Sequence, residues 1–480
     1  MLFRSKPNLA QQSPLKFRQI HTIQLDDSNE AVLYRIPPLK VVWLEIEASS
    51  TQIVSTESDP IRRIVITPDP CSEPIKMLDL FPHNRIGVDA AGTNQLIIEE
   101  QYEQDTLKSL ERAIQVIDPD VIFTANGDEL LFPYLISRVS YLNMEKQLSL
   151  SRDGTPLTHT RFQVEGSNSF MSYGIIHHRA STQFYLNGRL HIDSAIYGGL
   201  HFDDGNIYGI IEIARVCYVN LQRLTRVTIG GALQSLQFFY AYSLNVLIPE
   251  EKRNSEYFRD GAALLLSDRG GHILQPKIGL FGWVAELDFT SMYPALMVQY
   301  NVSPDMLNCS CCVQSGNKVP GLPYHLCQKR DGIVPLSLRL PLTKRIKYKN
   351  LAKSSTPPLA RQYQKMEEAL KWILVVCFGY LGFRNARFGR IEAHQSVCAY
   401  AREFLLNAVE IVERHGLTII HGIVDSLYVQ PPALMHTAEF YQKCVQIAEE
   451  ISLKTKIPIA FDPSRDYFDF ICFLDRKSVV

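Results

Sequence analysis

The chain has 480 residues, enough for about three domains, and 46% apolar and 21% charged residues are typical of an ordinary globular protein. This composition excludes a disordered or fibrous chain. The longest apolar run, residues 370–383, is too short to span a bilayer, and the N-terminus lacks the apolar segment of a signal peptide. We therefore expect a cytoplasmic protein without a membrane partner.

The formal net charge of −1 does not indicate a nucleic-acid partner, but the charges are unevenly distributed. Residues 329–390 contain fourteen Lys and Arg residues against three acids. This excess predicts a surface that binds phosphates, and a solvated helical face is the alternative.

Strands and helices alternate up to about residue 230, which favours one α/β domain. Residues 39–47 are typical of a buried strand, and residues 104–116 predict a helix. Residues 118–138 predict a turn, a strand, a loop and a helix. The apolar spacing of residues 208–227 predicts one amphipathic helix.

The second half of the chain begins with residues 270–294, which predict sheet. Two helices joined by the polar breaker at 354–358 predict an antiparallel helical hairpin. A helix from 390 to about 415 follows, then a strand, tight turn and strand at 418–430. A last helix is predicted from about 435 to 453.

Two acids in these elements suggest phosphoryl-transfer chemistry. Asp288 follows a β-rich run, and Asp425 lies at the predicted hairpin turn. Carboxylates at neighbouring strand ends can bind two divalent ions for an in-line displacement at phosphorus, and Mg²⁺ suits such a site. Spacing alone does not distinguish this pair from two unrelated surface acids.

These segments together resemble the family B DNA polymerases. DFTSMYP is similar to the palm motif D-x-x-S-L-Y-P, and HGIVDS to Y-G-D-T-D-S. RIKYK and KWILVVCFG are similar to the finger motifs R-x-x-x-K and K-x-x-x-N-S-x-Y-G. The resemblance covers roughly residues 40–477. The degenerate motifs resemble the divergent second archaeal subgroup and its bacterial relatives.

The resemblance implies a mixed α/β (α+β) multidomain chain: an RNase H-like exonuclease-type domain, then a polymerase palm with a helical-hairpin fingers insertion. The family's thumb would be absent, and either a separate polypeptide carries it or the gene is truncated. Primer–template DNA and dNTPs are the implied partners. The expected segments are a reduced N-terminal segment (1–40), the exonuclease-like domain (41–230), the first part of the palm (231–334), the fingers (335–385) and the second part of the palm (386–480).

The resemblance also assigns roles to single residues. Asp288 and Asp425 would bind two Mg²⁺ or Mn²⁺ ions, with the backbone carbonyl of Phe289. Tyr293 would be the steric gate that excludes a 2′-OH. The incoming triphosphate would contact two backbone N–H groups and three cations, from Ser291, Met292, Arg345, Lys349 and Lys371.

The polymerase motifs depart from the family pattern at several positions. Ile423 replaces the first Asp of D-T-D, Val375 and Val376 replace Asn-Ser, and Phe378 replaces Tyr. In the family, the Asn and Tyr positions line the nascent base pair. We therefore expect lower fidelity or tolerance of damaged templates.

The exonuclease motifs are degenerate too. Glu45 replaces an Asp beside a retained Glu47, Leu131 occupies a catalytic Asp position, and Glu212 replaces another Asp. Asp128 lies three residues before Leu131, where it would point elsewhere. Because Leu cannot ligate Mg²⁺, we expect a domain retained as structure, without 3′–5′ exonuclease activity.

Four cysteines, with His325 close by, suggest a zinc site. Their spacing is not C-x-x-C, two of them are adjacent, and free thiols are the alternative. They are Cys309, Cys311, Cys312 and Cys327.

The favoured function is a DNA-templated DNA polymerase of translesion or repair type. A catalytically weak DNA-binding accessory subunit is the alternative, and an active nuclease is disfavoured by Leu131. Decay of the whole gene would not spare the metal acids and the triphosphate cations while altering their neighbours.

Overall fold

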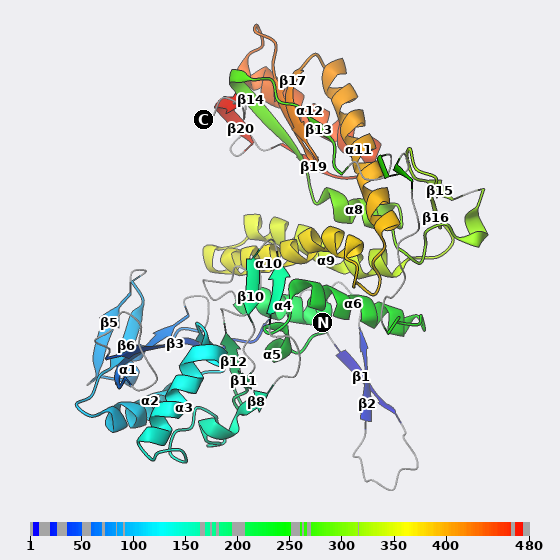
Figure 1. Ribbon diagram of the computed structural model, residues 1–480. Coiled ribbons are helices and arrows are strands. Elements are labelled where there is room, and N and C mark those ends of the chain that lie inside the picture. Colours follow the sequence, from blue (N-terminus) through cyan, green and yellow to red (C-terminus); the bar gives the residue numbers. More distant parts are fainter. Residues whose placement is uncertain are drawn as a thin grey trace. The chain divides into compact units, whose positions relative to one another are not determined.

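The computed structural model of the chain forms two compact units (Figure 1). The first unit contains Met1–Ala232 and Lys347–Ala369, and the second contains Leu233–Ile346 and Leu370–Val480. Most of the N-terminal segment expected at 1–40 lies outside the described residues. The structure describes residues 3–8, 20–25, 36–49, 59–69, 73–82, 84–89, 92–163, 169–172, 175–178, 182–193, 207–250, 260–261, 264–265, 270–314, 316–461 and 466–473.

The first unit contains a six-stranded mixed sheet with the strand order β12-β7-β3-β4-β6-β5. Strands β12, β7 and β3 are parallel, and the other neighbours pair antiparallel. All four side chains of β7 are buried, as expected for a strand covered on both faces. The strands are β3 (Val41–Ala48), β4 (Ile61–Pro68), β5 (Arg85–Val88), β6 (Asn94–Ile98), β7 (Val121–Thr124) and β12 (Leu190–Asp193).

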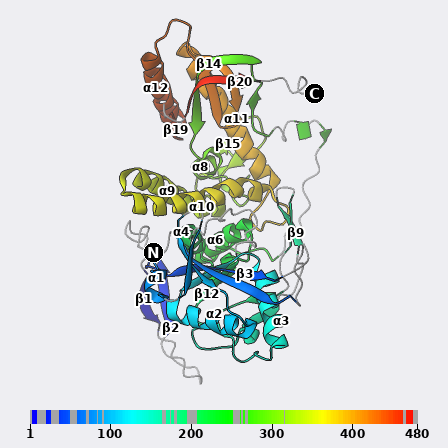
Figure 2. The same cartoon turned by 90° about the vertical axis from the view of Figure 1, so that its left-hand side faces the viewer.

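Helices α2 (Glu103–Ile117) and α3 (Phe132–Tyr141) contribute to the core of this unit (Figure 2). The predicted strand at 39–47 and helix at 104–116 are confirmed. Between β7 and α3, the predicted loop is a π-helical turn, η2 (Gly127–Leu131). The remaining elements are α1 (Met77–Leu80), β1 (Phe3–Asn8), β2 (Ile20–Leu25), η3 (Leu157–His159), β8 (Arg161–Gln163), β9 (Ser169–Ser172), β10 (Ile175–His178) and β11 (Thr182–Phe184).

The single helix predicted at 208–227 is wrong, because the chain breaks after one helix and starts another. Helix α4 (Ile207–Cys217) ends where Tyr218 adopts a left-handed conformation with φ of 55°. The side chain of Asn220 then accepts hydrogen bonds from two N–H groups and caps α5 (Leu221–Leu224). Apolar spacing continues through the break, so it could not reveal the cap. Helix α6 (Ile229–Ser243) follows.

The two helices predicted around 354–358 are confirmed as α9 (Ile333–Ser354) and α10 (Pro357–Gly382). Their connected ends belong to the first unit. There the ring of Tyr348 stacks on Tyr363 at 5.8 Å between centroids, and Gln362 Nε2 donates to the hydroxyl of Tyr208 at 3.0 Å.

The second unit is built on an antiparallel sheet with the order β13-β17-β18-β14-β19, and β20 also pairs with β14. Helices α11 (Ile391–Arg414) and α12 (Thr437–Thr455) lie along this sheet and bury their apolar faces (Figure 1). The other elements are β13 (Ile273–Leu274), β14 (Gly279–Phe289), α8 (Met292–Gln299), η5 (Ser310–Cys312), β15 (Asn317–Lys318), β16 (His325–Leu326), β17 (Thr418–Ile423), β18 (Ser426–Gln430), β19 (Ile459–Ala460) and β20 (Tyr467–Phe473).

Within the described residues, no helix combines the length and the apolar character that crossing a bilayer requires.

Candidate active site

The hairpin predicted at 418–430 is confirmed, and Asp425 lies at its tip. Ile423 pairs with Ser426 across a two-residue turn. Val424, the other turn residue, has a positive φ of 54°, which is uncommon for a β-branched side chain, and its N–H donates to the carbonyl of His272 at 2.9 Å. The turn is therefore held from outside the hairpin.

Asp288 reaches the same place from the end of β14. It pairs with Ser426, whose hydroxyl donates to the Asp288 carboxylate at 2.9 Å. The N–H of Phe289 donates to the carbonyl of Asp425 at 2.9 Å. The structure thus brings the two predicted carboxylates together, one near the end of β14 and the other in the turn of the hairpin that pairs with it.

A third acid, Glu286, joins this pair and was missed from the sequence. It lies two residues before Asp288 and therefore faces the same side of β14. The hydroxyl of Tyr428 donates to its carboxylate at 2.9 Å. The signal was the alternation E-x-D at the end of a strand, where both side chains share one face.

The electrostatics of the site reflect three crowded carboxylates. Burial raises the pKa of Asp288 to about 6, and the charges of Asp425, Glu286 and Asp466 add to this, although the Ser426 hydrogen bond opposes it. Burial also raises the pKa of Asp425, with a contribution from Glu286. Among the described residues no Lys or Arg forms an ion pair with Asp288, Asp425 or Glu286. Such a donor set suits divalent cations with oxygen ligands.

Arg345 lies close to the end of β14. Its guanidinium donates a hydrogen bond to the hydroxyl of Ser291, the left-handed residue that precedes α8. The first N–H groups of α8, which include that of Met292, have no partner within the helix. Backbone N–H groups and an Arg side chain therefore converge beside the carboxylates, and both bind phosphate well.

Tyr293 connects three parts of the second unit. Its ring lies 4.2 Å from that of Phe378 on α10, and Phe378 in turn stacks on His394 of α11 at 4.0 Å. On its other side, a Cβ at Gly271 would lie 3.1 Å from the Tyr293 hydroxyl and 2.8 Å from Val424. Only glycine leaves room there for the tyrosine beside the hairpin.

The remaining predicted polymerase residues are spread more widely. Lys371 is exposed on the part of α10 that belongs to the second unit, whereas Lys349 belongs to the first unit. Ile423, at the position of the family's other acid, is 40% exposed, and Val375 is 49% exposed. Val376 is half-buried.

In the first unit, a pocket of about 550 Å³ contains three of the residues from the degenerate exonuclease motifs. Glu45, Glu47 and Leu131 line it, together with Glu129. The carboxylate of Glu47 forms an ion pair with Arg63. Acids are thus present, but an apolar side chain lies among them.

Asp128 and Glu212 are not among the residues that line this pocket. Asp128 is buried, and Arg226 donates to its two oxygens at 2.9 and 3.2 Å. Glu212 is also buried, forms an ion pair with Arg215, and accepts from the hydroxyl of Tyr348 at 3.0 Å. Both acids therefore have structural partners.

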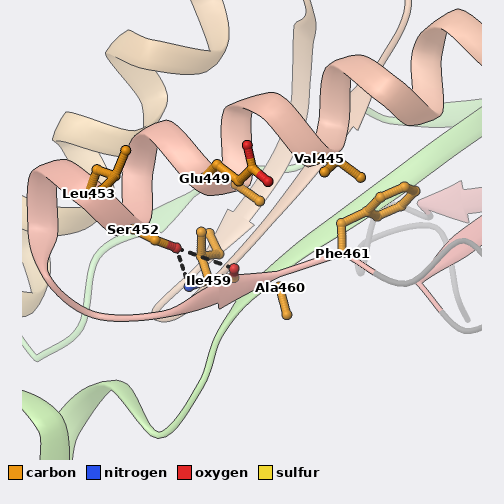
Figure 3. Close-up of a pocket in the computed structure, with 8 residues that line it drawn as sticks. Val445, Glu449, Ser452, Leu453, Ile459, Ala460 and Phe461 are labelled. Carbon is orange, nitrogen blue, oxygen red and sulfur yellow. Dashed lines mark hydrogen bonds between the residues drawn. The ribbon is translucent and has the colours of Figure 1, made fainter.

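A second pocket, also of about 550 Å³, lies between α12 and β19 and is mostly apolar (Figure 3). Ser452 on its wall exchanges hydrogen bonds with the backbone of Ile459. No carboxylate of β14 or of the β17–β18 hairpin lines it.

The four predicted cysteines come together in the segment between α8 and α9.

Comparison with known proteins identifies two segments. Residues 18–198 match the model "DNA polymerase family B, exonuclease domain", and residues 235–469 match "DNA polymerase family B". The DNA polymerase 2 of Saccharolobus solfataricus is 33% identical over 46% of this chain and 33% of its own length. The DNA polymerase 1 of Pyrococcus abyssi is 27% identical over 73% of this chain and 50% of its own length.

Among solved structures, the family B DNA polymerase of Pyrobaculum calidifontis resembles this fold with a TM-score of 0.64 and 19% identity. The match covers 99% of this chain and 62% of that one. The chain spans a third to a half of the length of these curated relatives. Because two models of one family match both halves of the chain, the chain belongs to DNA polymerase family B.

Proposed function

We propose that the second unit is the catalytic part of a DNA-templated DNA polymerase. The observation that carries this proposal is the pair Asp288 and Asp425, held on β14 and in the adjacent hairpin turn and without a basic partner among the described residues. Like charges are kept together at a cost in stability, which is typical of a functional site.

Family B polymerases use divalent metal ions, and three crowded carboxylates suit Mg²⁺ or Mn²⁺. Such ions, when bound, lower the pKa of the primer 3′-hydroxyl and neutralise charge on the phosphates. Asp288 and Asp425 would hold the ions, and the carbonyl of Phe289 lies beside Asp288 in the chain. The hydrogen bond from Ser426 fixes the orientation of Asp288 for this task.

Glu286 would supply the third carboxylate that Ile423 removes. It lies on the strand of Asp288, raises the pKa of both aspartates, and is oriented by the hydroxyl of Tyr428. A carboxylate on β14 would thus keep the negative charge that the hairpin loses where Ile423 replaces an Asp.

The nucleotide would bind on the side of α8. Arg345 would transfer its hydrogen bonds from Ser291 to the triphosphate, and the N–H of Met292 would assist. Lys371, which belongs to the same unit, would add positive charge. Tyr293, fixed by Phe378 and Gly271, would exclude a 2′-hydroxyl.

Two finer properties follow from the replaced residues. The apolar Val375, Val376 and Phe378 remove hydrogen bonds that test the new base pair, so we propose low fidelity or tolerance of damaged templates. In the first unit, Leu131 leaves the acids of the pocket without a catalytic partner, so we propose that proofreading is lost.

Primer extension tests the main proposal. The purified chain at micromolar concentration is given a short primer–template, dNTPs and Mg²⁺ or Mn²⁺, in parallel with Asp425→Asn. We expect extension by the wild type and a loss of about 10³-fold or more in the variant. No extension by a folded wild type that still binds the DNA would replace the polymerase by the accessory, DNA-binding function.

A further inference from the structure

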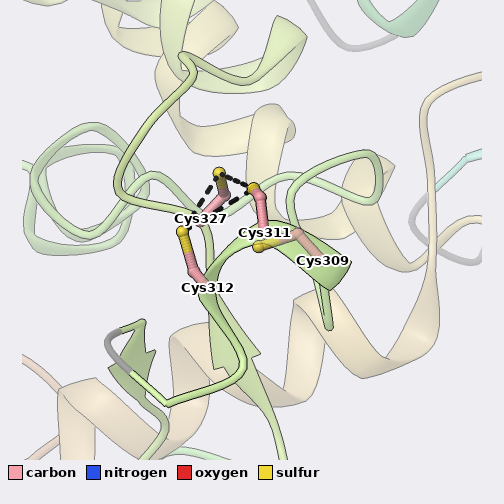
Figure 4. A group of neighbouring side chains, drawn as sticks. All are labelled: Cys309, Cys311, Cys312 and Cys327. Carbon is pink, nitrogen blue, oxygen red and sulfur yellow. Dashed lines mark hydrogen bonds between the residues drawn. The ribbon is translucent and has the colours of Figure 1, made fainter.

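Four cysteine side chains meet in the second unit, in the segment that connects α8 to α9 (Figure 4). Cys309, Cys311 and Cys312 lie at the η5 turn, and Cys327 follows β16. All four are free thiols in the structure, and three of them are buried. Their Sγ atoms lie within 4.8 Å of one another.

The spacing of the sulfurs matches the edges of a tetrahedron around one ion. The Sγ atom of Cys311 lies 3.7 Å from that of Cys312 and 3.6 Å from that of Cys327, and the third edge of this triangle is 3.9 Å. A Zn–S bond of about 2.3 Å places tetrahedral ligands about 3.8 Å apart. An iron–sulfur cluster distributes its thiolates over several irons, which requires wider spacing. We propose that these four cysteines bind one structural Zn²⁺ ion.

His325 is excluded as a ligand through its Nε2 atom. This nitrogen lies 2.9 Å from the backbone carbonyl of Cys309, which can only accept, and 3.9 Å from the Cys309 sulfur. The nitrogen that donates this bond carries a proton and has no lone pair for a metal. The ligand set is therefore four sulfurs, and His325 orients the loop that carries one of them.

The segment has little regular structure, and thiols make up part of its interior. One of its buried clusters consists of Met306 and three of the cysteines. Regular structure among its described residues is limited to η5 and to the two-residue strands β15 and β16. A metal ion that cross-links the cysteines would stabilise such a segment, as in many small metal-binding folds.

The proposed ion would stabilise the start of α9. The side chain of Asn301 donates to the carbonyls of Cys327 and Arg330, at 2.8 and 2.7 Å, and accepts from the N–H of Gly332 at 2.8 Å. The cysteine cluster is thereby connected to the first turn of the helix that carries Arg345. Loss of the ion would loosen this helix and weaken nucleotide binding.

Elemental analysis of the full chain, purified without chelator, tests the proposal. We expect one Zn²⁺ per chain in the wild type and a loss of about tenfold or more in Cys327→Ser. Cys444→Ser, which removes a buried thiol of α12, is the matched control and should keep its zinc. If the first variant does not fold, Co²⁺ exchanged into the wild type should give the intense near-ultraviolet absorption of four thiolate ligands.

A wild type that contains no zinc, and that gives no thiolate–Co²⁺ absorption after reduction, would overturn the proposal. Stoichiometric iron with visible absorption would overturn the choice of zinc. Neither readout depends on primer extension, so the zinc site and the polymerase function are tested separately.

Discussion

The carboxylate of Asp128 in the first unit is buried against the guanidinium of Arg226, whereas Asp288 and Asp425 in the second unit have each other and Glu286 as neighbours. Asp128 also accepts from the N–H of Phe184 at 2.9 Å. In the first arrangement an Arg of the same unit neutralises the carboxylate. In the second, the negative charge would have to be neutralised by a bound cation.

This difference distinguishes acids that stabilise the fold from acids that are suited to binding a cation. A buried carboxylate with a cation and hydrogen bonds stabilises the folded state, and losing either partner is costly. Crowded carboxylates without a cation destabilise it, and a bound divalent ion reverses the sign. The same change from Asp to Asn should therefore have opposite effects on the stability of the two units.

The largest effect is expected for Asp128→Asn. Removing this charge leaves Arg226 buried without its counter-charge, and the free energy of unfolding of the first unit should fall by about 3–5 kcal/mol. Hydrogen exchange of β7 and β12 measures this unit separately from the other. Glu129→Gln, an exposed acid on the same turn, should change it by less than about 0.5 kcal/mol. Equal protection in both variants would contradict the structural role of Asp128.

The pH dependence of the first unit should follow His191. Burial lowers the pKa of this ring to about 4, although Asp128 raises it and Arg226 lowers it further. In the unfolded chain His191 binds a proton near pH 6.5, whereas in the folded unit it remains neutral down to about pH 4. The free energy of unfolding therefore falls by about 3 kcal/mol as the pH falls from 6.5 to 4. Denaturation at several pH values should show this slope, and His191→Gln should flatten it. An unchanged slope in the variant would assign the acid sensitivity to other groups.

In the second unit, Glu286→Gln should lower primer extension by about tenfold and raise the Mg²⁺ concentration needed for half-maximal rate. The reason is the loss of one negative charge beside Asp288 and Asp425. Tyr428→Phe keeps the charge and removes only the hydrogen bond to it, so its effect should be smaller. An unchanged Mg²⁺ dependence in Glu286→Gln would remove Glu286 from the metal site.

Asp288→Asn should stabilise the second unit when EDTA is present, the opposite of the result for Asp128. Its folded pKa of about 6 lies above the unfolded value of 3.8, so stability is lost as pH rises from 3.8 to 6. Because Asp288 is only partly buried, water screens its charge, and we expect a gain of only about 1 kcal/mol above pH 6. Denaturation with and without Mg²⁺ checks this, since the ion should stabilise the wild type alone. A loss of stability in EDTA would show that Asp288 is satisfied within the fold.

The sequence predicted the elements with strong patterns and the motifs with fixed spacing. The hairpin around Asp425 and the strand that ends after Asp288 carry alternating apolar residues and a tight turn, and both are present. The break in the helix at 208–227 was missed because Asn220 caps the next helix without changing the apolar spacing.

Long-range partners were the other part that the sequence could not supply. The ion pair of Asp128 with Arg226 joins residues 98 positions apart, and no local sequence pattern predicts it. Glu212 matched a catalytic motif by position, yet Arg215 and Tyr348 satisfy its charge in the interior. Glu286 could have been predicted from its two-residue spacing from Asp288, which places both side chains on one face of the strand, but it lies outside the sequence motifs.

The smallest expected effect is that of Glu47→Gln. Glu47 retains the identity of a catalytic acid and lines the pocket of the first unit, but Leu131 lies in the same pocket and Arg63 neutralises the carboxylate. Glu212 is not among the residues that line this pocket. Two-metal hydrolysis needs its acids at fixed positions around the same ions, and Leu131 stands at one of these positions, so we expect no activity that Glu47→Gln could reduce. With an end-labelled primer, Mg²⁺ and no dNTPs, wild type and Glu47→Gln should leave the 3′ end equally intact. Degradation by the wild type that the variant abolishes would make the first unit an active nuclease, and its acids would then join those of the second unit as ligands for metal.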